Sequence, residues 1–364
     1  MLRRTSPTRI IKPLCFRMSS NQTKPKQILI DTDAGVDDAI AICLALKHRS
    51  VHVRAITCSF GNTSLQNVVE NVAQCVYHCS ADSTPTIPFV HIGAESGMSG
   101  EAADASYFHG KDGLGDAGLP AVPTPFTDKL ISTEEAPSVI LRLAEESKQE
   151  NTPLTIVTLG PLTNLAKVLK LDPNFAASNE HIDLVVMGGC GNAHGNATRV
   201  SEFNVHSDVE AASVVFSQWN SPSLTVIPWE LNILRPLPWK SFEKFIAPTQ
   251  QTSRTSDFLT KITAKIYVVP EDPSKEGKDG NKRSSEGAVI CDALAVAVGI
   301  DPGGVITGFT QTHVEVDTRK GMTKGMTLCD WGCYDGVERP KNVKWVTDVN
   351  VKKYEELLEQ ALID

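Results

Sequence analysis

The stretch Ile28–Leu46, ILIDTDAGVDDAIAICLAL, decides how the rest of the sequence is interpreted. It places four aspartates within eight residues, between a short apolar run and a longer one with helical spacing. The first run predicts a buried parallel strand, Gly35 a tight turn after it, and the second run a helix that is covered on most sides. The aspartates then lie at the carboxyl end of a strand, where open α/β sheets bind ligands. They are Asp31, Asp33, Asp37 and Asp38.

The number of carboxylates in this stretch exceeds what helix capping needs. One aspartate before a helix is usually an N-cap, and a single cap satisfies one or two backbone N–H groups. Two carboxylates about 4 Å apart repel each other by about 4 kcal/mol at an effective dielectric constant of 20. The set therefore requires a cation or raised pKa values. An EF-hand is excluded, because Gly35 comes too early and the final bidentate glutamate is missing.

Strand, turn and helix alternate along most of the chain. Further strands are expected at 53–59, 86–92, 154–159, 182–187, 224–227, 312–316 and 343–349. Because the intervening helices have crossover length, the pattern predicts a single-domain, doubly wound, mostly parallel open sheet with helices on both faces. We expect this α/β domain to span residues 27–364. Residues 269–287 are the most polar stretch, and they are interpreted as a solvated loop or a lid over the sheet edge.

The first 26 residues differ in charge from the rest. They contain seven basic residues and no acidic one, whereas the whole chain has a net charge of −8. This basic leader resembles a mitochondrial transit peptide, although a disordered tail or a later start at Met18 fits equally well. The acidic remainder argues against nucleic acid or an anionic membrane as a partner. Since no apolar run of about 18 residues occurs, no membrane span is expected. We expect a cytoplasmic protein, with mitochondria as the alternative.

The cysteines indicate a reducing compartment. All nine are scattered, their number is odd, and no CxxC occurs. A disulfide framework or a zinc site is therefore not expected.

Polar side chains recur where predicted strands end. Carboxylate and amide oxygens without a Cys/His set suit Ca²⁺ or Mg²⁺. Amides beside carboxylates suit a ligand with several hydroxyl groups, such as a sugar, since a hydroxyl both donates and accepts. The side chains in question are Asp33, Asp38, Asn62, His109, Asn196, Glu202, Asn204 and Asp292.

The stretch DTDAGVDDA at 31–39 resembles the amino-terminal signature of the nucleoside hydrolases, the Ca²⁺-dependent N-ribohydrolases. The likeness continues along nearly the whole chain from Ile28. Gly61-Asn62 resembles the family's GN, and 109–115 its HGxxGLG loop. The GPLTN turn at 160–164 and the MGG, GN and EFN elements within 187–204 are similar to further family blocks, and Asp292 resembles the late metal-binding aspartate.

The resemblance implies a reaction and a set of roles. A ribonucleoside and water would give ribose and a free base, and the protein would be a homodimer or homotetramer. Ca²⁺ would be held by Asp33, Asp38, Asp292 and the main-chain oxygen of Leu159, and Asp33 would deprotonate the attacking water. The residues expected to bind the nucleoside, chiefly through its hydroxyl groups, are Asp37, Asn62, Met187, Asn196, Glu202 and Asn204.

The sequence departs from the family pattern at three places. Ala34 stands where proline is usual, and Trp229-Glu230 stands where many members have an aspartate-bearing segment, for which we have no functional account. Cys291 precedes the late aspartate, where well-known members have a histidine that is proposed to protonate the leaving base. A buried cysteine usually acts as a small hydrophobic residue. We therefore expect His109 to supply the leaving-group acid, with His194 as the second candidate. The base preference stays open.

Two other functions remain compatible with the aspartate motif. Asp31-x-Asp33 after a strand also fits an Mg²⁺-dependent phosphohydrolase with an aspartyl-phosphate intermediate, although that class has no use for the EFN block. A nucleoside- or ribose-binding protein without catalysis is the other alternative, and Asp33 argues against it because a binder needs no base beside a metal.

Overall fold

The computed structural model describes residues 24–80, 87–219, 223–246, 253–267, 287–333 and 335–363. The leader up to residue 23 and residues 268–286, which include nearly all of the expected lid, lie outside these ranges. The division of the chain at residue 26 therefore stays a prediction. No helix in the described part is long and apolar enough to cross a membrane.

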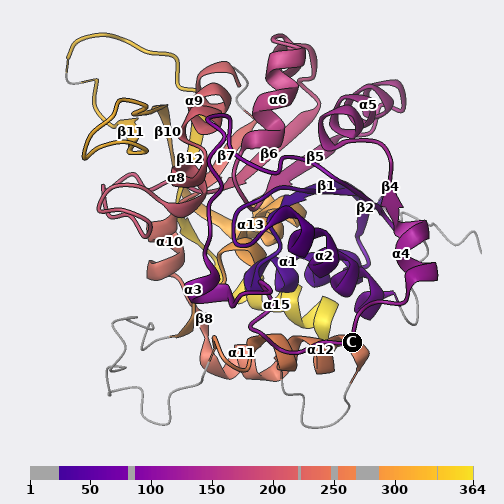
Figure 1. The fold of residues 1–364 in the computed structure, drawn as a ribbon. Helices are drawn as coiled ribbons and strands as arrows, with labels where there is room; N and C mark the ends of the chain where they lie inside the picture. Colours follow the sequence, from indigo (N-terminus) through magenta and orange to yellow (C-terminus); the bar gives the residue numbers. More distant parts are fainter. Residues whose placement is uncertain are drawn as a thin grey trace, which may run out of the picture.

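One ten-stranded sheet organises the fold (Figure 1). Its spatial order is β11-β10-β12-β7-β6-β5-β1-β2-β3-β4, and every neighbouring pair is parallel except the two that β10 makes with β11 and β12. The predicted doubly wound, mostly parallel α/β class is confirmed. The strands are β1 (Lys26–Thr32), β2 (Val51–Cys58), β3 (Phe89–His91), β4 (Ile131–Ser132), β5 (Leu154–Thr158), β6 (Ile182–Met187), β7 (Leu224–Ile227), β10 (Ile306–Val316), β11 (Thr327–Asp330) and β12 (Val343–Val349).

Helices cover both faces of this sheet, and strand β1 shows how the sequence directs them. Ile28 and Ile30 point into one core, while Leu29 points into the other, because successive side chains of a strand alternate between faces. The first core is covered by α1 (Val36–Lys47), α2 (Leu65–Cys79), α11 (Trp239–Ile246), α12 (Arg254–Thr263), α13 (Cys291–Ile300) and α15 (Val351–Leu362). The second is covered by α5 (Ala136–Gln149), α6 (Thr163–Leu171) and α9 (Val209–Gln218), which form the upper layer of Figure 1.

Short elements complete the described chain. They are α3 (Ser106–His109), α4 (Thr124–Leu130), α7 (Phe175–Ser178), α8 (Phe203–Ser207), α10 (Trp229–Leu234) and α14 (Pro302–Val305), together with the two-stranded sheet of β8 (Leu237–Pro238) and β9 (Gly287–Ala288).

The strand predictions fail mainly at the antiparallel edge. β10 begins at Ile306, six residues before the predicted start, and β11 was not predicted. The beginning of β10 is hard to recognise because its register with β12 shifts on both sides of Gly308 and because Phe309 is exposed. A bulge of this kind breaks the alternation on which the prediction depends. β3 is shorter than expected, at Phe89–His91.

Candidate active site

The site lies where the winding of the sheet reverses. From β1 the chain moves outward through β2, β3 and β4, and it then returns to pair β5 with the other side of β1. A crevice at the carboxyl ends of two such strands is the usual ligand site of an open α/β sheet. The aspartate turn, residues 31–38, leaves β1 at this point, and Leu159 follows β5. The Leu159 N–H donates to the Asp31 carbonyl oxygen at 2.8 Å, so the two strand ends are joined.

Three carboxylates converge at these strand ends. Single oxygens of Asp37, Asp38 and Asp292 all lie within 4.8 Å of one another, and Asp38 and Asp292 are buried. The first two stand in the first turn of α1, and Asp292 stands in the first turn of α13. These two helices pack against each other and are apolar around most of their circumference, which brings their amino ends together. Asp37, which is predicted to bind the ribose, lies in the same carboxylate group as Asp38, and its role stays a prediction.

Asp33 lies beside the group and is held by Asn62. The Asn62 backbone N–H donates to Oδ2 of Asp33 at 2.8 Å, and its side-chain amide donates to Oδ1 at 3.0 Å and to Oδ2 of Asp38 at 3.0 Å. Two glycines make room for the Asp33 carboxylate. A Cβ atom on Gly61 would lie 2.0 Å from its Oδ2, and one on Gly160 would lie 2.8 Å from its Cγ. The family-like GN and GPLTN elements therefore meet at this aspartate.

The aspartate turn has an unusual backbone at Ala34. Its φ angle is +39°, in a region that residues other than glycine seldom adopt. The Ala34 N–H donates to Oγ1 of Thr32 at 3.0 Å, and that hydroxyl donates to Oδ1 of Asp38 at 2.5 Å. Proline, usual in the family at this position, has neither the N–H nor access to this φ. The alanine thus permits a hydrogen-bond chain that ends on Asp38.

Burial and mutual repulsion raise the pKa values of these acids. The pKa of Asp33 and that of Asp292 lie well above the usual value, chiefly because burial disfavours the charged form and secondly because neighbouring carboxylates repel it. The same two causes raise the pKa of Asp37 to about 7. A cation would relieve this repulsion. The donor set of carboxylate oxygens fits a hard divalent ion.

A second wall of the site is the post-β6 loop, residues 188–202, with the start of α8. Glu202 caps α8: its Oε1 accepts from the Asn204 N–H at 2.8 Å, and its Oε2 accepts from the N–H groups of Val205 and Gly189 at 3.1 and 3.0 Å. The side-chain amide of Asn204 donates to the carbonyl oxygen of Leu159 at 2.6 Å and to that of Met187 at 3.2 Å. This wall therefore brings together four predicted residues, namely Met187, Leu159, Glu202 and Asn204.

Asn196 is the predicted site residue that the structure leaves outside the buried group. It is exposed on the post-β6 loop, and its Oδ1 accepts from the Phe203 N–H at 2.8 Å. Its side chain thus contacts the residue next to Glu202 rather than the aspartates.

His109 is buried against the aspartate turn. Its Nδ1 accepts from the Val36 N–H at 3.1 Å and lies 4.0 Å from Oδ1 of Asp37. Burial lowers the pKa of His109 to about 4. At neutral pH the ring is therefore uncharged, with its proton on Nε2. His194, the second candidate, is exposed on the post-β6 loop.

Sequence reasoning missed two asparagines that connect the aspartate turn to neighbouring segments. Asn164 donates to Oδ1 of Asp31 at 2.8 Å and to the Cys58 carbonyl oxygen at 3.0 Å, and it accepts from the Ala94 N–H at 2.9 Å. Asn71 is buried on α2 and contacts the aspartate turn. The available signal for Asn71 was a polar residue within the apolar stripe of an amphipathic helix.

The two further departures from the family pattern lie close to the site. Cys291 is buried within the apolar core, and burial followed by repulsion from Asp37 raises the pKa of its thiol well above the usual value. The thiol therefore stays protonated, as expected for a small hydrophobic residue. Glu230 accepts from the Gly191 N–H at 2.9 Å, which ties α10 to the post-β6 loop.

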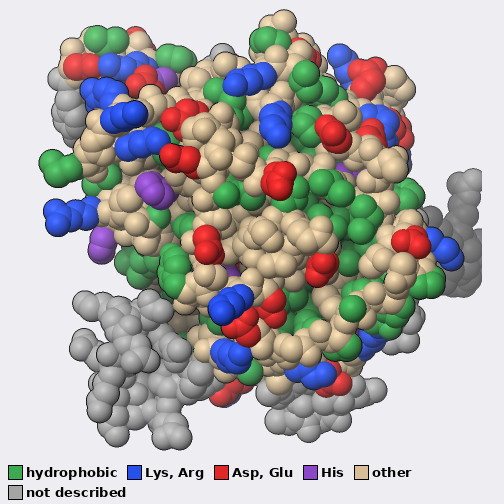
Figure 2. Space-filling view, in the orientation of Figure 1, with side chains coloured by type: hydrophobic (Ala, Val, Ile, Leu, Met, Phe, Trp, Pro, Cys, Tyr) green, Lys and Arg blue, Asp and Glu red, His purple; other side chains and the backbone are tan. Residues whose placement is uncertain are grey.

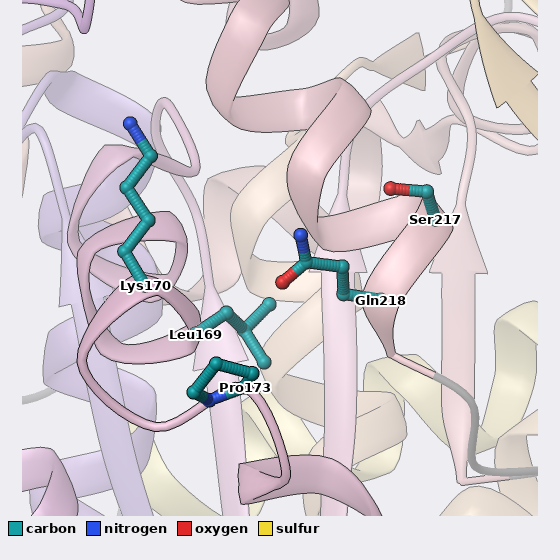
Figure 3. Close-up of a pocket in the computed structure, with 5 residues that line it drawn as sticks. All are labelled: Leu169, Lys170, Pro173, Ser217 and Gln218. Carbon is teal, nitrogen blue, oxygen red and sulfur yellow. The ribbon is translucent and has the colours of Figure 1, made fainter.

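Other surface features offer poorer sites. The pocket in Figure 3 lies between the carboxyl-terminal ends of α6 and α9 and has one charged residue in its lining, Lys170. Asp37, Asp38 and Asp292, in contrast, lie in the first turns of their helices. Basic and acidic side chains are interspersed over the face shown in Figure 2, so that this face has no continuous basic surface of the kind that binds nucleic acid.

Comparison with known proteins supports one family. The family model described as inosine-uridine preferring nucleoside hydrolase matches residues 28–356. The chain is 33% identical to uridine nucleosidase 1 of Arabidopsis thaliana, with 90% of each chain covered. It is 30% identical to the inosine-uridine preferring nucleoside hydrolase of Leishmania major, over 90% of this chain and 93% of the relative. In two rice proteins named probable uridine nucleosidase 1 and 2, which are 34% identical, the match spans 57% and 53% of their length.

Solved structures of nucleoside hydrolases share this fold. A solved structure titled inosine-guanosine nucleoside hydrolase is similar with a TM-score of 0.77 at 29% identity, covering 93% of this chain and 98% of that one. A plant nucleoside hydrolase structure, at 24% identity and a TM-score of 0.76, shows the same fold. Because the family model spans nearly the entire described chain and the carboxylates converge where the family signature lies, this chain belongs to the nucleoside hydrolase family.

Proposed function

We propose that this chain is a Ca²⁺-dependent N-ribohydrolase that converts a ribonucleoside and water into ribose and a free base. The observation that carries the proposal is the convergence of Asp37, Asp38 and Asp292, with Asp33 beside them, at the reversal point of the sheet. So many buried carboxylates are costly unless a cation or a bound ligand compensates their charge.

The aspartates and one carbonyl group would hold the ion. Asp33, Asp38 and Asp292 are the proposed ligands, with the Leu159 carbonyl oxygen completing the set. When bound, the ion supplies an acidified water molecule and positive charge beside the ribose. The Cys291 thiol does not compete for the ion, because it stays protonated.

Asp33 is the proposed general base. Asn62 holds both of its oxygens, and Gly61 and Gly160 leave room for the carboxylate in this position. A base must lie within hydrogen-bond reach of the proton that it removes and must keep that position. Asp33 would take a proton from the water that attacks the anomeric carbon.

The hydroxyl groups of the ribose would bind between the two walls. The two N–H bonds of each of the Asn62 and Asn204 amides are already used within the protein, which leaves their side-chain oxygens to accept. Asp37 and these two oxygens would therefore accept hydrogen bonds from the ribose hydroxyl groups. Glu202, with Asn196 beside it, would take the 5′ hydroxyl. Oε1 of Glu202 accepts from the Asn204 N–H, and a carboxylate oxygen has a second lone pair with which to accept from a ligand.

His109 would assist the leaving base. Because its Nδ1 accepts the Val36 N–H and its pKa is about 4, few molecules carry an imidazolium at neutral pH. The neutral ring offers the Nε2–H as a hydrogen-bond donor to the base as negative charge develops on it.

Free ribose is the decisive readout. Purified protein is incubated with inosine, guanosine, adenosine, uridine and cytidine, in excess Ca²⁺ or after chelation. We expect ribose from at least one nucleoside, its loss on chelation, and recovery when Ca²⁺ is restored. Turnover of a phosphate monoester in the same buffer would favour the phosphohydrolase alternative, and nucleoside binding without ribose would favour the binding protein.

A further inference from the structure

The segment that carries His109 is held together by hydrogen bonds between its own residues. This His109 segment, residues 106–116, follows a long irregular stretch and contains the short helix α3. The Gly115 N–H donates to the His109 carbonyl oxygen at 2.7 Å, and Oδ1 of Asp112 accepts from the N–H groups of Leu114 and Asp116 at 2.7 and 2.9 Å. A restraint on Asp112 therefore reaches His109.

Asn71 connects this segment to the aspartate turn. Its side-chain amide donates to the Ala34 carbonyl oxygen at 3.0 Å and to the Asp112 carbonyl oxygen at 2.8 Å. An amide has two N–H bonds, so both are used, one on each segment. The connection is buried, where losing one partner costs the full desolvation of the other.

The geometry at Gly113 shows how closely the segment approaches. A Cβ atom on Gly113 would lie 2.7 Å from the Asn71 amide nitrogen and 2.8 Å from Cγ2 of Thr63, and its φ angle is +82°. Only glycine fits at this distance. The His109 ring lies similarly close to Gly35, where a Cβ atom would be 2.6 Å from Nδ1.

We propose that Asn71 is a positioning residue, which fastens the His109 segment to the aspartate turn and so sets the distance between the leaving-group donor and the carboxylates. The inference deepens the proposed function and rests on it. Asn71 touches neither substrate nor metal in this scheme. Its effect on the reaction passes through His109, and that effect disappears once His109 is absent.

Asn67 provides a matched control for the test. It stands one turn earlier on α2, and its amide donates to the neighbouring carbonyl oxygen of Lys111 at 3.1 Å and to Oγ1 of Thr63 at 2.8 Å. Both of its N–H bonds are thus used on residues outside the aspartate turn. Gly118 is the control for Gly113, since its φ is +64° and nothing lies within 4 Å of an added Cβ.

The test combines kinetics with hydrogen exchange. We expect Asn71→Ala and Gly113→Ala to lower kcat for the best nucleoside by about 10- to 100-fold, because small displacements of catalytic groups cost factors of this size. Exchange of the amides of residues 106–116 is expected to accelerate in both. Asn67→Ala and Gly118→Ala are expected to stay within about threefold of the parent. Melting temperatures identify any variant that fails to fold. If either Asn71→Ala or Gly113→Ala fails to fold, the other variant still tests the proposal.

A double-mutant cycle separates positioning from a general structural role. In the His109→Ala background, Asn71→Ala is expected to lower kcat by no more than about twofold, because coupled residues are not additive. The inference is overturned if the full loss persists there, if kcat of Asn71→Ala stays within threefold of the parent, or if exchange in 106–116 is unchanged. A parent protein that releases no ribose overturns the proposed function instead, and the exchange experiment then decides on Asn71 alone.

Discussion

The aspartate turn and the post-β6 loop lie at the same edge of the sheet, but their buried charges are compensated in different ways. In the turn, Asp33 and Asp37 lie beside further carboxylates and their pKa values are raised. In the loop, Glu202 is equally buried, yet three backbone N–H groups surround its carboxylate and partly offset the rise in its pKa. Backbone N–H groups thus compensate the buried charge of Glu202, whereas the carboxylates of the aspartate turn need a positive charge from outside the protein.

This difference separates the roles of the two walls. A carboxylate whose partners are backbone N–H groups is fixed before any ligand arrives, which suits recognition of a neutral hydroxyl group. Carboxylates that repel each other gain most from a cation, which suits an ion site. Metal binding should therefore depend on the turn and α13, and it should be insensitive to changes in the loop.

Removing a carboxylate from the cluster gives the largest expected effect. Asp292→Asn is expected to lower kcat/KM by at least about 10³-fold, or about 4 kcal/mol, because an ion ligand is lost. The rise in melting temperature on adding Ca²⁺ is expected to vanish as well, while the metal-free variant is at least as stable as the metal-free parent, since repulsion is relieved. Scanning calorimetry with and without Ca²⁺ measures both. The exposed Asp128→Asn is the control, and an undiminished Ca²⁺ effect in Asp292→Asn would contradict the assignment.

His109 contacts the aspartate turn but is uncharged at neutral pH, so its role can be tested separately from that of the carboxylates. His109→Ala is expected to lower kcat for a nucleoside by about 10²-fold, within the range typical of acid–base assistance. A nitrophenyl riboside, whose leaving group needs no assistance, is expected to lose less than about threefold. Steady-state kinetics on both substrates gives the ratio, with His194→Ala as the control. Equal losses on the two substrates would remove His109 from the leaving-group role, and a selective loss in His194→Ala would transfer that role.

Glu202→Gln tests the second wall, in which backbone N–H groups compensate the buried charge. The glutamine amide would present N–H groups to backbone N–H groups, so that the cap of α8 weakens. We expect a loss of about 1–2 kcal/mol in the free energy of unfolding, as for other N-caps, and about a tenfold loss in kcat/KM. The Ca²⁺-induced rise in melting temperature is expected to stay as in the parent. Urea unfolding measures the first quantity, and a variant that no longer responds to Ca²⁺ would show that the two walls are not independent.

The parts of this site that sequence reasoning reached are those that a local pattern determines. Asp33 and Asp38 follow a buried strand and precede an apolar helix, so their place at the sheet edge could be predicted. The sheet order could not be read from the pattern, but the alternation of elements was enough for the fold class. β11 could not be predicted, because it has only four residues and pairs with a strand that contains a bulge.

The connecting residues could not be found, because their partners are remote in the sequence. Asn164 bonds to Asp31 across 133 residues, and Asn71 bonds to Ala34 across 37. A local pattern can mark Asn71 as a polar residue on an apolar helix face, but it cannot name the partner of either asparagine until the chain is folded. The membership of Asp37 in the carboxylate group is a similar case, since it depends on how α13 brings Asp292 against α1.

The smallest expected effect is a pH dependence that only the metal-free protein shows strongly. The pKa values of Asp33, Asp37 and Asp292 are raised above the unfolded value of 3.8, so the folded protein binds protons more tightly than the unfolded chain. Its stability therefore increases as pH falls from about 7 towards 4 and decreases as pH rises through the same range.

Ca²⁺ is expected to flatten this dependence, because the bound ion keeps the carboxylates ionised. Urea midpoints at pH 5, 6, 7 and 8 are compared for metal-free and Ca²⁺-loaded protein, and we expect the metal-free protein to lose stability steadily across the series. Asp37→Asn removes one of the titrating groups and should reduce the slope. A residual slope from Asp31 should persist with and without the ion, since burial alone raises its pKa to about 6. If the metal-free protein became more stable towards pH 8, repulsion within the turn would not be what separates it from the loop.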